Sequence, residues 1–552
     1  MGDGKSPTAG MAVTSLLSKY SEDEECMRNQ RCRNHKQKVW ATHLHLHTWA
    51  LLQTLQQYIR QMRMRKMLTQ NLRWSATPSS DRAVPIEDSI MTKPAERRKD
   101  REMFQYVVVV SLREGDQGRG YAPEIIYQYP KTEHLQTWLQ KEHETLHRSI
   151  PLFCFPDEQY VPSKDVQSET FSFVLTNVDG SRRFGYCRRL LPPGKNVPEV
   201  YCIISRLGCF DLFAKVLEEV ERRRQICFAM VYPFVQSLKD SVCPEPGHSL
   251  RIKSFIPSQG TQVTTEVVLF DLPIYFNRVN VKFRRFSSME TRVNFSIAGH
   301  VSQEIVLTRP VDSRLEHVEF EGLLTCLNPE TVVQVFASLL LERRVILLSS
   351  KLSQLSRCIH ALVVLLYPFS WQHTYIPVLP PSLIDAVCNP TPFILGLQRA
   401  TLPLLEDQPM EEVLLVDLDR KTFLRKVGDE AQILPPKLAT PLVEDLITCT
   451  SRTSVPGSPS LKETVSNAFL HFHVQLVGTY PQHMHSDKHG RRMLNQRAFR
   501  KSFSSRTTRH FLKVFMQTQA FQGFIGERET GTPTQELFEQ RVRDFLQSEA
   551  GS

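Results

Sequence analysis

Residues 329–379 decide the fold, and they read PETVVQVFASLLLERRVILLSSKLSQLSRCIHALVVLLYPFSWQHTYIPVL. The first segment predicts a helix, because Pro329 suits a first helical turn and Glu330 lies near the positive end of the helix dipole. Apolar runs of strand and helix length follow it. The expected elements are a helix, a strand, a helix and a strand, at 329–343, 345–349, 353–367 and 374–379. A strand–helix–strand unit of these lengths predicts a parallel sheet with a right-handed crossover.

The sequence before this unit has a different pattern, in which short apolar, β-branched segments are separated by turn signals. It predicts strands at 104–112, 124–129, 169–175, 183–187 and 200–204, and helices at 132–147 and 211–224. Asp179 and Gly180 have the chemistry of a tight hairpin turn, because this pair accepts positive φ angles. We therefore expect an α+β amino-terminal lobe built on an antiparallel sheet.

The sequence after this unit predicts one more strand, at 412–417, and then mainly helices, of which 464–479 and 508–525 are the clearest. The expected carboxy-terminal lobe is thus an α/β domain with a parallel sheet flanked by helices, followed by a helical C-terminal part. Residues 1–103 differ from both lobes, with a polar start, a basic middle and a Ser/Pro stretch. We expect them to form a basic, largely disordered extension.

The net charge of +10 is unevenly distributed along the chain. Residues 1–101 contain 18 Lys/Arg against 10 Asp/Glu, and 488–513 contain nine Lys/Arg and no acid. Such stretches favour phosphates, anionic lipid headgroups or an acidic partner, with a solvated helix face as the alternative. The candidate membrane or phosphate contacts are Arg491, Arg492, Arg497, Arg500 and Lys501. Nucleic acid is not an expected partner, because the basic segments lack regularly spaced aromatic residues and fit no recognition module.

Twelve cysteines are scattered along the chain, and none forms a C-x-x-C pair. Several lie inside apolar runs, so buried free thiols of a reducing cytosol are a better interpretation than a disulfide framework. No apolar run approaches the roughly 18 residues that would span a bilayer.

The sequence contains no phosphate loop, no dinucleotide-binding glycine motif, no nucleophile elbow and no kinase signature. It does contain one H-E-x-x-H match, HETLH at 143–147, which on a helix could hold zinc with the glutamate as a base. A catalytic zinc site needs a third ligand. Glu169 is at a suitable distance along the chain, but it is the first residue of a predicted apolar strand. An exposed helix face is therefore the favoured interpretation, and a zinc hydrolase remains a remote alternative. We expect no catalytic residue, cofactor or metal.

Several motifs closely resemble those of the DENN-domain family. The upstream motifs are IPLFCFPD (150–157), ETFSFVLTNVDG (169–180), GYCRRL (185–190) and YCIIS (201–205). The central motifs are RPVDSRLEHVEF (309–320), LERRVILL (341–348), YPFSWQHTYIP (367–377) and PTPFILG (390–396). The downstream motifs are EEVLLVD (411–417) and LPP (434–436). All three parts of a DENN module occur in order. The sequences of these motifs are most similar to those of the second DENN-domain subfamily and its short member.

This resemblance implies a longin-like amino-terminal lobe and a larger α/β lobe. The implied domains are an upstream lobe at 104–250, a central DENN domain at 251–405 and a mostly helical downstream domain at 406–548. The segment between the Ser254-Phe-Ile-Pro257 and Leu307-Thr-Arg-Pro310 motifs is longer than the family pattern, so we expect an atypical insertion at about 263–302.

The resemblance also implies a function. Family members promote guanine-nucleotide exchange on Rab GTPases, which they grip through the switch regions between the two lobes. No covalent catalysis is required, which agrees with the lack of catalytic motifs. The chain would act in the cytoplasm, peripheral to vesicle membranes, with a Rab GTPase and an anionic membrane surface as partners. The alternative is a DENN-fold scaffold that binds a GTPase or a membrane without exchanging nucleotide.

Nine charged, aromatic or loop residues are candidates for GTPase contact: Asp312, Arg314, Glu316, Arg343, Arg344, Trp371, His373, Asn389 and Thr391. Each also has a structural interpretation. The charged loop that contains Asp312, Arg314 and Glu316 could cap a helix. The two arginines at 343 and 344 follow a helix whose dipole they would stabilise, and the side chains at 371 and 373 could pack inside the domain. Asn389 and Thr391 occupy a Pro-bracketed loop without an obvious core role.

Overall fold

The computed structural model describes thirteen segments of the compact unit Pro85–Ser552. They are residues 102–114, 120–130, 148–157, 166–176, 181–255, 263–268, 281–282, 290–295, 302–309, 318–451, 460–486, 492–531 and 537–551. The expected helix at 132–147 with its H-E-x-x-H match, the turn at 177–180 and nearly all of the amino-terminal extension lie outside these residues.

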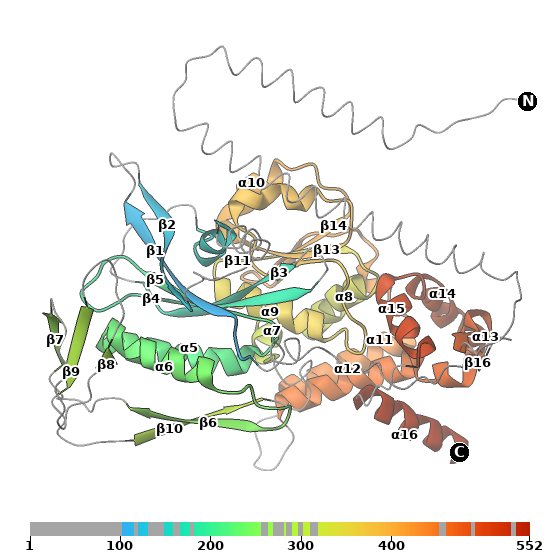
Figure 1. The fold of residues 1–552 in the computed structure, drawn as a ribbon. Helices are drawn as coiled ribbons and strands as arrows, with labels where there is room; N and C mark the ends of the chain where they lie inside the picture. The colour runs from blue at the N-terminus through green and yellow to red at the C-terminus, as the bar shows by residue number, and fades with distance from the viewer. Residues whose placement is uncertain are drawn as a thin grey trace, which may run out of the picture. The chain divides into compact units, whose positions relative to one another are not determined.

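The amino-terminal lobe is built on an antiparallel sheet in the order β2-β1-β5-β4-β3 (Figure 1). Its strands are β1 Tyr106–Glu114, β2 Tyr121–Tyr129, β3 Glu169–Thr176, β4 Arg182–Leu190 and β5 Glu199–Ser205. All five predicted strands are confirmed, with small changes at their ends. The antiparallel architecture expected for this lobe is therefore correct.

Both faces of this sheet are buried, because side chains alternate between two cores. Val107 and Val109 of β1 belong to one core, and Val108 and Val110 belong to the other. The first core is completed by α5 Phe210–Ile226, η1 Phe228–Met230 and α6 Val231–Asp240. The second core receives the helical residues 148–154 and the central domain. The sheet therefore lies between its own helices and the carboxy-terminal lobe.

Two small sheets connect the lobes in sequence, and the sequence patterns predicted neither of them. One pairs β6 Ser249–Phe255 with β10 Ser302–Thr308. The other has the order β7-β9-β8, with β7 Val263–Val268, β8 Val281–Lys282 and β9 Glu290–Phe295. The second sheet falls within the expected insertion.

The central sheet has the order β12-β13-β11-β14-β15, and its first four strands are parallel. Its strands are β11 Arg344–Ser349, β12 Thr374–Ile376, β13 Phe393–Gln398, β14 Val413–Asp417 and the antiparallel β15 Thr422–Arg425. The parallel sheet is confirmed, but β13 was not predicted, and it separates β11 from β12. Gly396 in β13 has no room for a side chain, since a Cβ there would lie 2.0 Å from the carbonyl oxygen of Pro377. This glycine, together with Pro390 and Pro392 just before the strand, explains why the strand was not predicted.

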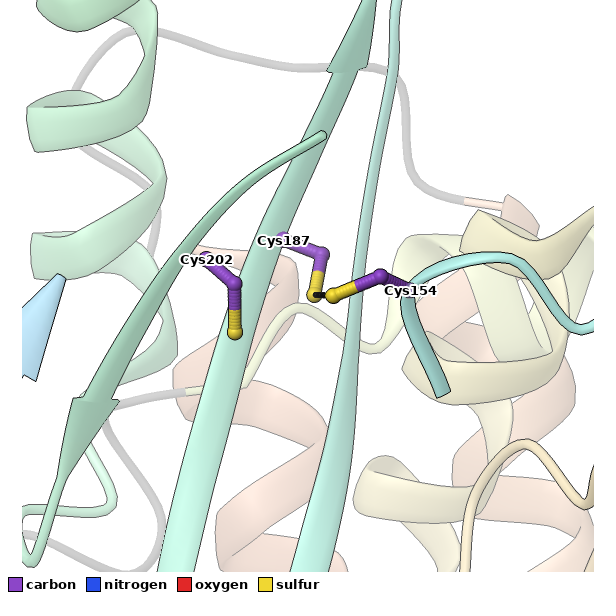
Figure 2. Close-up of side chains that lie close together, drawn as sticks. All are labelled: Cys154, Cys187 and Cys202. Carbon is purple, nitrogen blue, oxygen red and sulfur yellow. Dashed lines mark hydrogen bonds between the residues drawn. The ribbon is translucent and has the colours of Figure 1, made fainter. Parts of the chain in front are cut away.

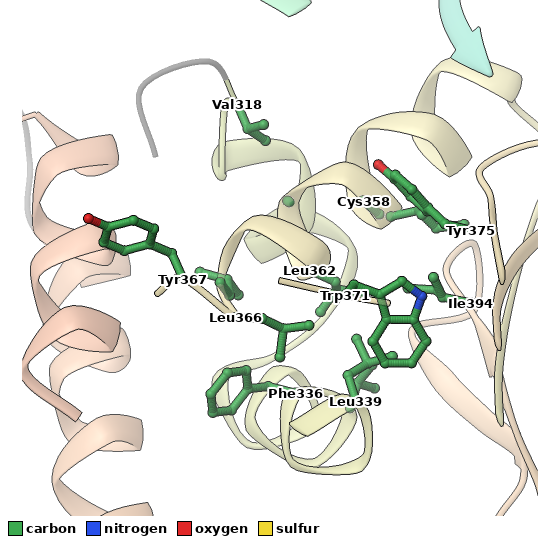
Figure 3. Close-up of a cluster of buried hydrophobic side chains, with 14 of the residues drawn as sticks. Val318, Phe336, Leu339, Cys358, Leu362, Leu366, Tyr367, Trp371, Tyr375 and Ile394 are labelled. Carbon is green, nitrogen blue, oxygen red and sulfur yellow. The ribbon is translucent and has the colours of Figure 1, made fainter. Parts of the chain in front are cut away.

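Helices cover both faces of the central sheet. On one side lie α7 Glu321–Cys326, α8 Pro329–Leu340 and α9 Leu352–Val364, and on the other η2 Pro381–Cys388, η3 Arg399–Thr401 and α10 Leu402–Glu406. Asn328 caps α8 by accepting a hydrogen bond from the N–H of Thr331 at 2.8 Å. Figure 3 shows the core on the α8–α9 side, where Phe336 and Leu339 meet Leu362 and Leu366.

The chain beyond the central sheet is mainly helical, as expected. Its elements are η4 Glu430–Gln432, α11 Pro436–Ser451, α12 Leu461–Val477, η5 Tyr480–His483, β16 Met484–Ser486, β17 Arg492–Leu494, α13 Gln496–Ser502, α14 Arg506–Phe515, α15 Gln519–Glu529 and α16 Leu537–Gly551. The segment 508–525 is not one helix but parts of α14 and α15. Thr518 breaks it by capping α15, where its hydroxyl accepts a hydrogen bond from the N–H of Phe521. Among the described residues, no helix is long and apolar enough to cross a membrane.

Candidate functional site

The two lobes are joined where β3 of the amino-terminal sheet lies against α9 of the central domain. Glu169 on β3 caps α9, because its Oε1 accepts hydrogen bonds from the backbone N–H and the Oγ of Ser353 at 2.8 and 2.7 Å. Arg182 at the start of β4 donates to the carbonyl oxygen of Trp371 at 2.6 Å. A carboxylate at a helix N-terminus is stabilised by the helix dipole, so this contact favours one arrangement of the lobes.

A buried polar triad lies at the centre of this junction. Ser172 Oγ is 2.6 Å from Nε2 of His360, and the hydroxyl of Tyr375 is bonded to Nδ1 of the same ring. Burial lowers the pKa of His360 from 6.5 to about 3, so the imidazole is neutral at physiological pH. A neutral imidazole has one donor and one acceptor nitrogen, and the two hydroxyls satisfy both. The triad therefore joins β3, α9 and β12 without burying a charge.

A pocket of about 340 Å³ opens beside the triad, between the lobes. Its floor includes Ser172 and His360, with the ring of Phe210 3.8 Å from the imidazole. Its rim is charged, with contributions from both lobes: Asp211, Lys215, Glu218, Glu319 and Arg357. The pocket is thus a polar surface shared by α5, α9 and the segment before α7.

The charges on the rim are available to a partner. Asp211, Lys215 and Glu218 follow each other at helical spacing along α5, so they form one stripe. Burial raises the pKa of Asp211, and Lys462 of α12, with its Nζ 3.1 Å from a carboxylate oxygen, offsets only part of that rise. Lys215, Glu218 and Arg357 are exposed, and none of them forms a salt bridge with another described residue. A protein surface with both signs of charge would complement this rim.

A second group of exposed or partly exposed cations lies on the neighbouring elements β17, α13 and α14, and we call this group the basic surface. Its six cationic residues are Arg492, Arg497, Arg500, Lys501, Arg506 and Lys513. None of them forms a salt bridge with another described residue, and the described residues 492–513 contain no acid. Met493 and Val514 in the same segments are 47% and 43% exposed. The combination of unpaired cations and exposed apolar side chains is typical of surfaces that contact anionic membranes.

Comparison with known proteins identifies the family. The DENN (AEX-3) domain pattern matches residues 196–292 and 287–421, the uDENN domain matches 123–190, and the dDENN domain matches 495–541. These matches cover more than half of the chain. The chain belongs to the DENN-domain family.

Individual members of this family show to which subfamily the chain belongs. The chain is 46% identical over 465 residues to the mouse (Mus musculus) DENN domain-containing protein 2A, covering 82% of this chain and 42% of that protein. It is 44% identical over 487 residues to the human (Homo sapiens) protein 2B, covering 85% and 39%. It is 44% identical over 449 residues to the mouse protein 2D, covering 81% and 87%. The chain thus spans about two fifths of proteins 2A and 2B, and it is a member of the second DENN-domain subfamily.

Two of the predicted GTPase contacts in this DENN-domain chain are engaged by its own acidic residues. Arg343 makes a bidentate pair with Asp429, with nitrogen–oxygen distances of 2.5 and 2.6 Å. Arg344 lies 3.8 Å from Glu412, which is largely exposed. Both arginines remain partly exposed, but neither is a free cation. They tie the start of β11 to the residue before β14 and to the segment after β15.

Trp371 and His373, two further predicted contacts, are buried in this structure. Trp371 is 3% exposed and donates from Nε1 to the carbonyl oxygen of Thr374 at 3.1 Å (Figure 3). His373 is 9% exposed, and its Nε2 lies 3.1 Å from Oε2 of Glu342. Their side chains therefore serve the packing of the central domain, which was the alternative interpretation, and a partner cannot reach them here.

Two of the remaining predicted contacts lie in a loop that the structure describes, and the others lie outside the described residues. Asn389 and Thr391 lie in the loop between η2 and β13, where Asn389 Oδ1 accepts from the N–H and Oγ1 of Thr391 at 3.0 and 2.9 Å. Asp312, Arg314, Glu316 and Arg491 lie outside the described residues. Sequence reasoning missed the rim of the pocket altogether. The spacing of the charged residues on α5 indicates an exposed helix face. It does not indicate that α9 and the segment before α7 lie opposite that face.

Proposed function

We propose that this DENN-domain chain is a guanine-nucleotide exchange factor for a Rab-family GTPase, acting in the cytoplasm at vesicle membranes. The observation that carries the proposal is the charged pocket between the two lobes of a protein from this family. The switch region of the GTPase would bind the rim formed by α5 and α9. Lys215 and Arg357, one from each lobe, are the contacts that we expect to matter most.

Exchange needs no covalent step. A protein that binds the nucleotide-free GTPase more tightly than the loaded form must weaken the hold on nucleotide by the same factor, through linkage. Each tenfold difference corresponds to about 1.4 kcal/mol. The junction suits this role because its buried contacts fix the elements of the two lobes that carry the rim charges. Such preorganisation lowers the free energy that binding must spend on ordering the two lobes.

The test is the release of a fluorescent GDP analogue from a panel of purified Rab GTPases, with and without the full chain. We expect acceleration for one or a few members. The double variant Lys215→Glu/Arg357→Glu should reduce that acceleration at least tenfold, because it reverses both cations of the rim. Lys437→Glu is the matched control, since Lys437 is exposed on α11, outside the pocket lining.

Two other results would decide against the proposal. Binding to a nucleotide-free Rab without faster GDP release would establish a scaffold instead of an exchange factor. Normal exchange by the double variant would show that the GTPase binds outside the pocket.

We also propose that the basic surface binds anionic lipid headgroups and so holds the chain at the membrane where its GTPase resides. Each Lys or Arg near an anionic membrane contributes about 1 kcal/mol, so six unpaired cations suffice for reversible binding. The exposed side chains of Met493 and Val514 would enter the headgroup region. This proposal rests on different residues from the exchange site.

Cosedimentation with vesicles separates this role from exchange. The full chain should bind phosphatidylserine-containing vesicles and not pure phosphatidylcholine, and binding should weaken as salt is added. Arg497→Glu/Lys501→Glu should lower the affinity at least tenfold, whereas Lys437→Glu/Arg543→Glu, two exposed cations elsewhere in the helical part, should change it little. Equal losses in both variants would show that net charge, and not this surface, is responsible.

A further inference from the structure

Three buried cysteines from different elements meet in the amino-terminal lobe (Figure 2). Cys187 on β4 and Cys202 on β5 are register partners on neighbouring antiparallel strands. Cys154 ends the helical residues 148–154 and points toward Cys187. All three are free thiols with essentially no exposure. None of them has a part in the junction, the pocket or the basic surface.

The spacing of the sulfur atoms is close to that of a metal site. The three Sγ atoms all lie within 4.8 Å of one another, and those of Cys154 and Cys187 are 3.9 Å apart. Three thiolates bound to one ion at about 2.3 Å, the zinc–sulfur distance, would stand about 4 Å apart. One edge of the triangle therefore already has the required length. Small side-chain rotations would bring Cys202 to the same spacing.

The donor set restricts the kind of ion. In the part of the chain that the structure describes, no His, Asp or Glu joins this cluster, so all the ligand atoms would be sulfur. Thiolates select Cu⁺ and Zn²⁺, whereas Mg²⁺ and Ca²⁺ require oxygen ligands. Structural zinc almost always has four ligands. A three-sulfur site therefore fits Cu⁺ better than Zn²⁺.

The surroundings help to form the first thiolate. Burial by itself raises the pKa of Cys154, but hydrogen bonds from the neighbouring thiols and the charge of Arg189 lower it overall. The guanidinium of Arg189 donates to the carbonyl oxygen of Cys154 at 3.3 Å and pairs with Asp157 at 2.5 Å. The pKa values of Cys187 and Cys202 are raised, so an incoming ion would displace their protons.

We propose that Cys154, Cys187 and Cys202 form a three-sulfur site for one soft cation, Cu⁺ in preference to Zn²⁺. The ion fastens the helical residues 148–154 to the middle of the sheet. Binding releases protons, so the affinity increases with pH.

The experiment uses the reduced, metal-free full chain under anaerobic conditions. Cu⁺ is titrated in competition with the chromophoric chelator bicinchoninate, and Zn²⁺ is titrated in parallel with a zinc indicator. We expect one Cu⁺ per chain, and a loss of affinity of at least tenfold in Cys202→Ala. Cys358→Ala is the matched control, because Cys358 is equally buried and its thiol partner is Cys326 alone. It should bind Cu⁺ like the wild type.

A measurement on the wild-type protein keeps the test independent of how the variants fold. The extended X-ray absorption fine structure of the loaded chain should show three sulfur ligands and no nitrogen or oxygen. Oxygen or nitrogen ligands, equal binding by Cys202→Ala and the wild type, or no binding in competition with the chelator would each overturn the site. Tighter binding of Zn²⁺ by three sulfurs would keep the site and overturn its assignment to Cu⁺.

Discussion

The central domain is joined to its two neighbours by contacts of opposite character. At the centre of the upstream joint, Ser172, His360 and Tyr375 are buried as neutral groups, with the charged side chains of Glu169 and Arg182 beside them. The downstream joint is centred on Glu342, which accepts from the N–H groups of Gln519 and Ala520 at 2.9 and 2.8 Å and so caps α15. The difference teaches that the centre of one joint depends on shape and on hydrogen bonds between neutral groups, whereas the centre of the other depends on a buried charge.

The two joints should therefore respond to acid in different pH ranges. The pKa of His360 is lowered from 6.5 to about 3 in the folded chain. Below pH 6.5 the histidine therefore binds a proton in the unfolded chain but not in the folded chain, and the free energy of unfolding falls. Burial raises the pKa of Glu342, but His373 and the N-terminus of α15 lower it overall from 4.5. Its contribution is present above pH 4.5 and is lost as the pH falls below that value.

The largest effect should come from removing the centre of the upstream joint. His360→Ala leaves a cavity and two buried hydroxyls without partners, so it should destabilise the chain by about 2–4 kcal/mol. Thermal unfolding measures the effect. His471→Ala, on the exposed face of α12, is the control and should be nearly neutral. Similar melting temperatures for both variants would mean that the triad contributes nothing to the joint.

The second prediction isolates the acid response of the upstream joint. A single histidine that is excluded from protonation changes stability by up to about 1.4 kcal/mol per pH unit. The melting temperature of His360→Gln should therefore fall less between pH 6.5 and 5 than that of the wild type. The melting temperature of this variant should still fall somewhat with pH, because burial also lowers the pKa of His473, to about 4. An unchanged slope would show that His360 is protonated in the folded chain.

The third prediction concerns the downstream joint. Glu342→Gln removes the charge that faces His373 and the N-terminus of α15, and it should cost about 1–2 kcal/mol at neutral pH. The difference in melting temperature from the wild type should shrink as the pH falls below 4.5. If the difference persists in acid, the contact depends on the shape of the side chain and not on its charge.

The smallest effect is expected at the ion pair between Arg343 and Asp429. The Asp429 carboxylate is half exposed, so Arg343→Ala should destabilise the chain by less than about 1 kcal/mol. A double-mutant cycle with Asp429→Ala gives the coupling energy, and added salt should reduce it. A coupling as large as the effect of Glu342→Gln would remove the distinction between a buried and a surface charge.

The fold was largely predictable, because local patterns encode it. Both sheets, the helices that flank them and the helical end follow from apolar periodicity and turn chemistry, and the family motifs fix their order. β13 and the break at Thr518 were missed for local reasons, a glycine without room for a side chain and a hydroxyl cap inside an apolar run. The strands β6 to β10 carry weaker patterns.

The candidate site was much less predictable. Trp371 and His373 have the composition of a binding surface, yet the structure places both inside the domain. The pocket needs Lys215 and Arg357 from segments about 140 residues apart, and single-sequence patterns do not reveal such a pairing. The residues of the basic surface could be named from the sequence because they are contiguous in it, and their binding role stays a prediction.

Gly396 has a consequence for how this protein can vary over evolutionary time. The backbone of β13 passes so close to Pro377 that even the methyl group of alanine would have to push two neighbouring segments apart. Any single-nucleotide change that replaces this glycine should therefore be removed by selection wherever the protein is still needed. A gene copy that has lost the glycine without compensation would be decaying, which makes this position a simple marker of whether a copy remains in use.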